Sequence, residues 1–256
     1  MDTILASNIT TGRNIGADLV AIAQPTFLPW SGWFDLADQV DLLIVLDDVA
    51  FSKQSWQQRN RLRTAEGLVY ITVPVRTAGK LGQRIIDAEL AGSGAIEKLI
   101  RTVSQNYSRA PHFSRYFVEF SAVLRESASA GMLGRLNCGL IDWFFQQLGI
   151  STPRVRSSEL AVEGKRGALV AKLCEYVGAL RYLSPAGAQD YLLDDRAEFD
   201  SRGIAVELQV YEHPIYRQCF QPFMPYASVL DLLLNEGDEA AAILRSGRRP
   251  PRRLEP

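Results

Sequence analysis

The segment "QPTFLPWSGWFDLADQVDLLIVLDDVAF", residues 24–51, joins a proline-containing loop, an apolar run and two adjacent acids. The run at 42–46 predicts a buried strand, and a buried strand tolerates Asp47 and Asp48 only where it leaves the core. A short apolar strand precedes the loop. Strand, loop, helix and strand in this order predict an α/β fold with a parallel sheet. The expected elements are a strand at 19–23, a helix at 32–39 and a strand at 41–46.

Further along the chain, apolar residues recur at helical spacing in three stretches between residues 93 and 150. We therefore expect a parallel or mostly parallel, Rossmann-like sheet with an inserted helical subdomain at about 93–150. Strand and helix patterns then alternate again. The expected organisation is a loose N-terminal arm at 1–18, a single α/β domain at 19–237, and a C-terminal helix with a basic, proline-rich tail at 238–256. We expect this tail to be disordered, with an anion-contacting arm as the alternative.

The composition excludes several classes of protein. The formal net charge of the 256 residues is -1, so no overall attraction to nucleic acid or to an anionic membrane is expected. No apolar run approaches the ~18 residues that cross a bilayer, and the first residues lack the pattern of a signal peptide. Three widely spaced cysteines and two histidines predict reduced thiols, no metal site and a cytoplasmic protein.

The first candidate cluster follows the two opening strands. In an open parallel sheet, ligands bind outside the carboxyl ends of the strands. That rule places Asp47 and Asp48 beside the loop at 24–32, and the segment "FSKQSWQQRNR" follows at once. Two interpretations stay open: a surface loop whose charges pair with one another, or a site for a carboxylate or phosphate group. The candidate ligand-binding residues are Gln24, Trp30, Asp47, Asp48, Lys53, Trp56, Arg59 and Asn60.

The second candidate cluster is "EHPIYRQCFQPF", residues 212–223, directly after an alternating strand at 204–211. His213 is a candidate base that titrates near neutral pH, and Tyr216 and Gln218 can lie on the same side of an extended segment. A satisfied structural histidine is the alternative. Cys219 is a possible nucleophile beside a histidine, although its phenylalanine neighbours favour a packed thiol.

The third candidate cluster is the turn "YLSPAGAQDYLLD", residues 182–194. A strand that ends at Ser184, followed by Gly187, is typical of a turn where backbone closely approaches a ligand. A plain connection between a strand and a helix is the alternative.

These same segments resemble the WbqC-like family. The resemblance covers residues 20–237 and rests on "AQPTFLPWSGWF", "LDDVAFSKQSWQQRNRL", "YITVPV", "NYSRAPHF", "YLSPAGAQDYL" and "HPIYRQCFQPFMPYASVLDLLLNEG". It implies a cytoplasmic bacterial enzyme that acts in sugar modification or in acyl or aminoacyl transfer. Ala23 stands where many members carry His, and Ser184-Pro185-Ala186-Gly187 replaces a Ser-Gly-x-Gly turn. Besides the candidates above, the matching motif positions are Pro25, Pro29, Gly32, Tyr107, Pro111, Tyr191, Pro214, Ser228 and Asp231.

The leading hypothesis is a transferase that moves an acyl or aminoacyl group from an activated carrier, a thioester or a carrier protein, to an amino-sugar or similar small acceptor. His213 would be the general base. Tyr216 and Gln218 would orient the acceptor, Asp47 or Asp48 would bind its ammonium or hydroxyl group, and Lys53 with Arg59 would hold an anionic part. The motifs name no certain cofactor, and a phosphopantetheine-linked donor is the candidate. The alternatives are a nucleotide-using ligase or nucleotidylyltransferase, and a non-catalytic protein that docks a carrier.

Overall fold

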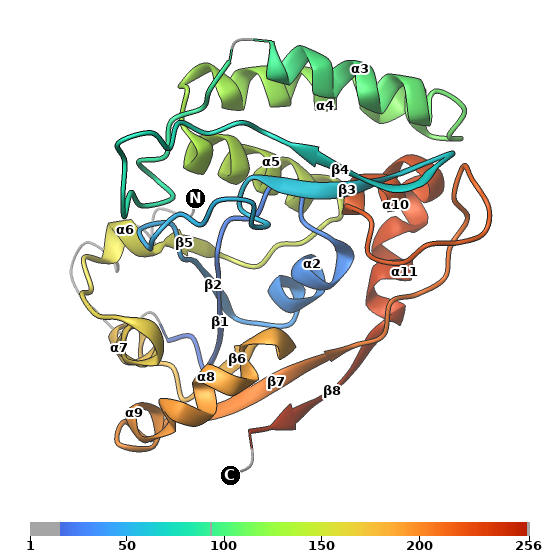
Figure 1. The fold of residues 1–256 in the computed structure, drawn as a ribbon. Helices are drawn as coiled ribbons and strands as arrows, with labels where there is room; N and C mark the ends of the chain where they lie inside the picture. Colours follow the sequence, from blue (N-terminus) through green and yellow to red (C-terminus); the bar gives the residue numbers. More distant parts are fainter. Residues whose placement is uncertain (1–15, 93, 255–256) are drawn as a thin grey trace.

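The structure of the protein is a computed structural model, which describes residues 16–92 and 94–254 (Figure 1). Most of the expected N-terminal arm lies outside these residues. Eight strands are present in the described part of the chain: β1 (Leu19–Ala23), β2 (Leu42–Val45), β3 (Arg59–Thr64), β4 (Gly67–Thr72), β5 (Arg154–Arg156), β6 (Arg181–Ser184), β7 (Ala205–Tyr211) and β8 (Arg248–Arg253).

Six of the strands form one sheet in the order β5-β2-β1-β6-β7-β8. The first five are parallel, and β8 runs antiparallel to β7. Numbered along the chain within this sheet, the spatial order is 3-2-1-4-5-6, which is the order of doubly wound nucleotide-binding folds. The expectation of a mostly parallel sheet is confirmed.

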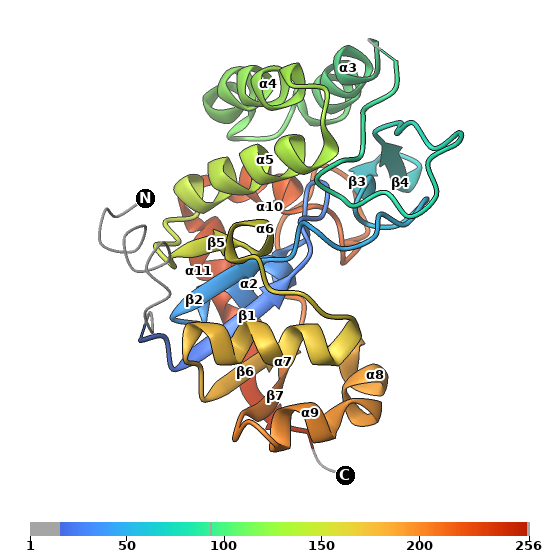
Figure 2. The same ribbon diagram turned by 90° about the vertical axis from the view of Figure 1, so that its left-hand side faces the viewer.

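The central strands are apolar without interruption because both faces of the sheet are covered. Ala21 and Leu43 point into one hydrophobic core, and Ile22 and Ile44 point into the other. Figures 1 and 2 show the two sets of helices on opposite faces. The first core holds side chains of α2 (Ser31–Asp38), α3 (Ala95–Tyr107), α4 (Phe113–Ser129), α5 (Leu133–Gln147), α10 (Val229–Glu236) and α11 (Ala240–Ser246).

The second core is covered by helices of the second half of the chain. These are α7 (Arg166–Val177), α8 (Gln189–Asp194) and α9 (Arg196–Asp200), with the short α6 (Ser157–Leu160) and the 3-10 turn η1 (Ala186–Ala188) as connections. A second 3-10 turn, η2 (Gly237–Glu239), joins α10 to α11 at the first core. No described helix is long and apolar enough to cross a membrane.

The three helices expected between residues 93 and 150 are present as α3, α4 and α5. Their buried side chains share one continuous core with α2, β1 and α10. The structure therefore does not establish them as a separate subdomain.

The strand β4, which contains the start of the motif "YITVPV", belongs to a second, two-stranded sheet. It pairs antiparallel with β3, opposing Arg61 to Tyr70 and Asn60 to Ile71. The sequence did not predict the arginine-rich β3, because its polar side chains mask the alternation of apolar and polar residues that is typical of a strand. The hairpin lies beside α3 and outside the main sheet (Figure 2).

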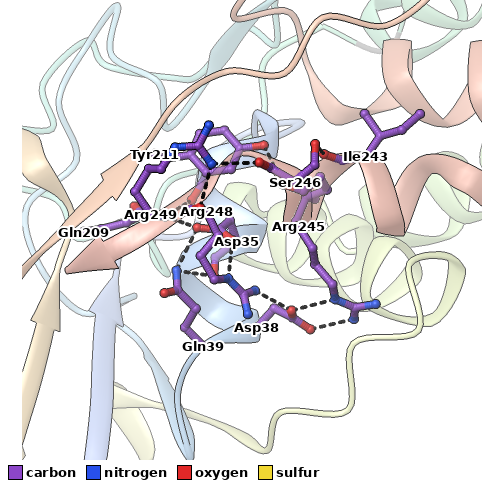
Figure 3. Close-up of polar contacts among 12 residues, drawn as sticks. Asp35, Asp38, Gln39, Gln209, Tyr211, Ile243, Arg245, Ser246, Arg248 and Arg249 are labelled. Carbon is purple, nitrogen blue, oxygen red and sulfur yellow. Dashed lines mark hydrogen bonds and ion pairs between the residues drawn. The ribbon is translucent and has the colours of Figure 1, made fainter.

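The expectation of a disordered tail is wrong, because residues 248–253 form β8 at one edge of the sheet. Figure 3 shows the ionic contacts that hold it. Arg248 donates to Asp35 at 2.9 Å and to Asp38 at 2.6 Å, and Arg245 donates to Asp38 twice, at 2.8 Å. Asp35 is fully buried and also accepts from Gln209 at 2.8 Å. Helix α2 thus supplies the carboxylates that attach the basic strand.

Candidate functional site

The carboxyl edge of the main sheet carries the candidate residues that follow its strands. Gln24 follows β1, Asp47 and Asp48 follow β2, and Ser184 ends β6. His213 lies just beyond the end of β7. Because neighbouring strands are about 4.8 Å apart, β2 and β7 are separated by about 14 Å. The acids and the histidine therefore lie at two ends of one edge.

At the β2 end, Asp47 joins β2 to the start of α6. Its carboxylate is buried and accepts from the Ser158 backbone N–H at 3.1 Å and from the Ser158 hydroxyl at 3.0 Å. The Ser157 hydroxyl donates to Asp48 and accepts from the Asp47 N–H at 3.1 Å. Asp48 is partly exposed, so of the two acids it is the one with access to a ligand. Sequence reasoning missed both serines, because they lie about 110 positions away in the chain.

The loop between β1 and α2 is held by buried amide side chains. The Asn60 amide donates to the carbonyls of Phe27, at 3.0 Å, and Leu28, at 2.8 Å. These bonds fix Leu28 at a φ of 46°. Gln24 is exposed, and its side-chain oxygen accepts from Gln57 at 2.8 Å. The structure thus places Asn60 behind the loop and Gln24 at its surface.

At the β7 end, His213 lies inside a group of aromatic rings. Its ring is stacked on Trp30 at 6.2 Å and on Tyr216 at 6.0 Å between centroids. The other rings within 6.4 Å belong to Tyr211, Phe223 and Tyr226. We call these six residues the aromatic cluster. Trp30 reaches it because its backbone pairs with Ser228, which precedes α10.

The environment of His213 sets its protonation and its tautomer. Nδ1 lies 2.9 Å from the carbonyl oxygen of Pro214. A carbonyl only accepts, so Nδ1 carries the hydrogen and Nε2 carries the lone pair. Nε2 is buried without a hydrogen-bond partner among the described residues. Burial lowers the pKa of His213, and the bond to Pro214 opposes this shift. The imidazole is therefore neutral at pH 7, with an unused acceptor.

Tyr216 and Gln218 are buried and bind a carboxylate. The Tyr216 hydroxyl donates to Asp231 at 2.7 Å, and the Gln218 amide donates to the same oxygen at 2.9 Å. Burial raises the pKa of Asp231, and these hydrogen bonds reduce the shift. Burial also raises the pKa of Cys219, whose thiol donates to Asn235 at 3.4 Å. A thiol with a raised pKa is a poor nucleophile near pH 7.

The candidates of the third cluster differ in exposure. Ser184 is fully buried, and its hydroxyl donates to the Pro185 carbonyl at 3.2 Å. Gly187 is exposed, and an added Cβ would meet no atom within 4 Å. Gly187 therefore borders open space at the edge of the sheet.

Lys53 and Trp56 precede the β3–β4 hairpin and Arg59 begins β3, so none of the three follows a strand of the main sheet. Lys53 is exposed in the turn before β3, and Trp56 is 45% exposed. The Arg59 guanidinium lies 4.6 Å from the centre of the Tyr70 ring on the hairpin. These side chains are open to solvent and are not among the residues of the aromatic cluster around His213.

A cavity of about 670 Å³ lies between α5 and the edge strand β5, away from the aromatic cluster. Its lining includes Arg135, Cys138, Asp142, Arg154 and Arg156. Burial raises the pKa of Cys138 to about 12, so its thiol stays protonated. Sequence reasoning did not identify this cavity, since it forms between segments with no shared motif.

Comparison with known proteins agrees with the motifs. The WbqC-like protein family matches residues 24–243. The chain is also 35% identical over 231 residues to a protein of Mycobacterium tuberculosis (strain ATCC 25618 / H37Rv) named uncharacterized protein Rv1507c, covering 90% of this chain and 99% of that protein. No solved structure matches the chain significantly. By the extent of the family match and the identity to this relative, the chain belongs to the WbqC-like protein family.

Proposed function

We propose that the protein is a transferase that moves an acyl or aminoacyl group from a thioester donor to the amine or hydroxyl group of an amino-sugar or similar small acceptor. The observation that carries the proposal is the neutral imidazole of His213, whose Nε2 lone pair has no partner among the described residues. A base of this kind is what acyl transfer to an amine or hydroxyl needs. We place this transfer in cytoplasmic polysaccharide or specialised-metabolite biosynthesis, as the resemblance of the motifs to the WbqC-like family implies.

In the proposed step, the acceptor nitrogen or oxygen attacks the thioester carbonyl carbon. A C–N or C–O bond forms, and the C–S bond breaks with its electron pair leaving on sulfur. His213 Nε2 takes the proton that the acceptor loses and then returns it to the leaving thiolate. The Nδ1–H of His213 donates its hydrogen bond to the Pro214 carbonyl throughout the reaction. This bond stabilises the imidazolium that exists between the two proton transfers.

The aromatic cluster would hold the acceptor. Trp30 is half-buried and Tyr226 is 49% exposed, so the cluster reaches the protein surface. Aromatic rings provide flat apolar walls with polar tips, which suit a sugar ring. Because Nε2 is buried, the acceptor would reach it by displacing Tyr226, the most exposed ring of the cluster, which lies edge-on to His213.

The other predicted residues take roles that fit their positions. The polar groups of Tyr216 and Gln218 are used in hydrogen bonds to Asp231, so they would not bind the acceptor. These bonds would instead hold the Tyr216 ring in place, and the imidazole of His213 is stacked on that ring. Gln24 and Asp48 would bind polar groups at the far end of an elongated acceptor, since they are the accessible polar side chains along the same edge.

The test is acyl transfer by His213→Gln, which keeps a hydrogen-bonding side chain but removes the base. Acetyl- and aminoacyl-thioesters of coenzyme A and of carrier proteins are mixed with amino sugars, and mass spectrometry detects the product. We expect kcat to fall by about 10²–10⁴-fold with KM little changed. His112→Gln is the matched control, because His112 lies at the start of α4. Equal kcat in His213→Gln and the wild type would remove the proposed base.

The strand order favours a second candidate, a nucleotide-using ligase or nucleotidylyltransferase. In a sheet of order 3-2-1-4-5-6, the ligand crevice lies where the order reverses, here between β1 and β6. Gln24 and Gly187 border that point. A nucleotide at ~100 times its dissociation constant adds about 2.7 kcal/mol to stability. A shift in Tm with ATP or a sugar nucleotide that is lost in Gly187→Val would support this candidate, and no shift with either would exclude it.

A further inference from the structure

Arg59, Arg61 and Tyr70 of the β3–β4 hairpin, with Lys53 and Trp56 of the turn before it, make up what we call the hairpin surface. The rings of Trp56 and Tyr70 lie 6.0 Å apart, and they are 45% and 50% exposed. The Arg61 guanidinium lies 5.3 Å from the Trp56 ring centre, and that of Arg59 lies 4.6 Å from Tyr70. Each arginine is thus held in place by a ring that solvent also reaches.

The cations of the hairpin surface have no internal carboxylate. Among residues 16–92 and 94–254, Lys53, Arg59 and Arg61 form no ion pair. Lys53 is exposed and the two arginines are half-buried, with the Nε of Arg61 buried and without a hydrogen-bond partner in the described part of the chain. The next segment of the chain differs, because Lys80 pairs with Glu89 and Arg84 with Asp87. Three positive charges are therefore available to a partner.

The shape and composition of the hairpin surface suit a protein partner better than a small molecule. The surface lies on the outside of the hairpin, whereas the cavity described above is lined by α5 and β5. Small ligands are bound mainly in concave pockets. Tryptophan, tyrosine and arginine are the residues that dominate binding energy in protein interfaces. The net charge of -1 for the chain gives no general attraction to nucleic acid.

The hairpin surface is also connected directly to the aromatic cluster. The carbonyl of Arg61 accepts from the N–H of Ser228 at 2.9 Å, and Ser228 pairs in turn with Trp30. Two strand spacings of about 4.8 Å place the backbone of Arg61 about 10 Å from that of Trp30. The Trp30 ring is stacked on His213. A partner bound to the hairpin would therefore deliver an attached group close to Nε2.

We propose that the hairpin surface docks the acidic face of a carrier protein that bears the acyl donor as a thioester. This inference rests on the proposed transferase function and names the partner that supplies its donor. Carboxylates of the carrier would pair with Lys53, Arg59 and Arg61, and an apolar side chain would pack on Trp56. The flexible thioester arm would then reach the aromatic cluster.

The experiment measures binding of purified, fluorescently labelled holo-acyl and holo-peptidyl carrier proteins by anisotropy. We expect at least one to bind with micromolar affinity at low salt, with affinity falling about tenfold or more in 0.5 M NaCl. Arg59→Glu/Arg61→Glu should weaken binding by about tenfold or more, and Trp56→Ala should also weaken it. Arg252→Glu/Arg253→Glu is the matched control, since both are exposed on β8 across the molecule (Figure 1). It should bind within about twofold of the wild type.

Any of three outcomes would overturn the docking proposal. The first is that no carrier protein binds even at concentrations 100 times the expected micromolar dissociation constant. The second is that Arg59→Glu/Arg61→Glu binds the carrier as well as the wild type does, and the third is that only a single-stranded DNA 20-mer binds through these residues. His213→Gln separates this proposal from the transferase. Carrier binding that persists in His213→Gln without transfer by the wild type would contradict the transferase alone. Docking alone would be contradicted if the wild type and Arg59→Glu/Arg61→Glu transferred the acyl group equally from coenzyme A thioesters and no carrier protein bound.

Discussion

His213 combines a neutral imidazole with an environment that several distant segments provide. Trp30 comes from the loop after β1, Tyr211 from β7, and Phe223 and Tyr226 from the loop before α10. The rings remove water from the imidazole and so disfavour its charged form. Beside this cluster, burial likewise raises the pKa of Asp231, the acceptor of the Tyr216 hydroxyl, and disfavours its carboxylate.

We predict that His213 makes stability depend on pH below neutrality. Its folded-state pKa is lowered, whereas the unfolded chain titrates near ~6.5. Between these two values the unfolded state binds more protons, so the contribution of His213 to the free energy of unfolding rises with pH up to about 6.5 and is then constant. Urea unfolding from pH 5 to pH 8 measures this slope. The slope should be reduced in His213→Gln and retained in His112→Gln. An equal slope in His213→Gln and the wild type would contradict the lowered pKa.

We predict that Asp231 stabilises the fold mainly as an acceptor of hydrogen bonds. Asp231→Leu leaves the donors of Tyr216 and Gln218 unsatisfied, at about 1–3 kcal/mol each, whereas Asp231→Asn keeps an accepting oxygen. Because the pKa of Asp231 is raised, the native state keeps its proton longer than the unfolded state. The contribution of Asp231 to wild-type stability therefore falls as pH rises above ~4, and any deficit of Asp231→Asn relative to the wild type should shrink toward pH 7. Urea unfolding of both variants checks this order, and equal losses would contradict it.

At the scale of elements, β8 shows how a helix can supply the partners that a strand needs. Its sequence, "RRPPRR", has little strand propensity, and its two prolines donate no hydrogen bond. An edge position tolerates them because one side of the strand needs no partner. Arg248 supplies the attachment through Asp35 and Asp38 of α2 (Figure 3). The prolines also make this exposed edge a poor template for aggregation.

We predict that Arg248→Ala lowers the free energy of unfolding by about 3 kcal/mol, because it leaves the buried Asp35 without its cation. This loss of stability lies at the low end of what breaking a buried ion pair costs, because the Arg248 side chain is 32% exposed. Arg253→Ala removes an exposed arginine from the same strand and should change stability by less than ~0.5 kcal/mol. Chemical denaturation compares the two variants. Equal effects would show that the contacts with α2 do not hold β8.

At the scale of the whole molecule, buried amides join parts of the chain that are far apart. Asn137 in α5 donates to the carbonyls of Pro25 and Gln57, each at 2.8 Å. It is fully buried and so connects a helix, the loop after β1 and the turn before the hairpin. These contacts couple the hairpin surface to the carboxyl edge of the sheet.

We predict that Asn137→Ala lowers the free energy of unfolding by about 2–4 kcal/mol, since two buried carbonyls lose their donor. Asn106→Ala is the control, because Asn106 donates only within α3, to Thr102. Its effect should stay below ~0.5 kcal/mol. Urea unfolding gives both values. A loss in Asn137→Ala no larger than in the control would contradict the coupling.

The sequence by itself determined the elements whose signal is local. Apolar periodicity located the strand at 41–46 and the three helices between 93 and 150. It also indicated that Gln24, Asp47 and Asp48 share one edge, because the carboxyl ends of neighbouring parallel strands lie together. These features depend only on residues near one another in the chain.

Only the tertiary structure decided which side chains meet. The pairing of Ser157 with Asp48, the stacking of Trp30 on His213 and the ion pair of Arg248 with Asp35 join residues 109 to 213 positions apart. The strand β8 forms because β7 and α2 provide its partners, although its own composition predicts disorder. Propensity and periodicity are properties of a short segment, whereas a contact depends on how the sheet orders its strands. For that reason the sequence predicted the candidate residues, and the fold separated them into the acidic end, the aromatic cluster and the hairpin surface.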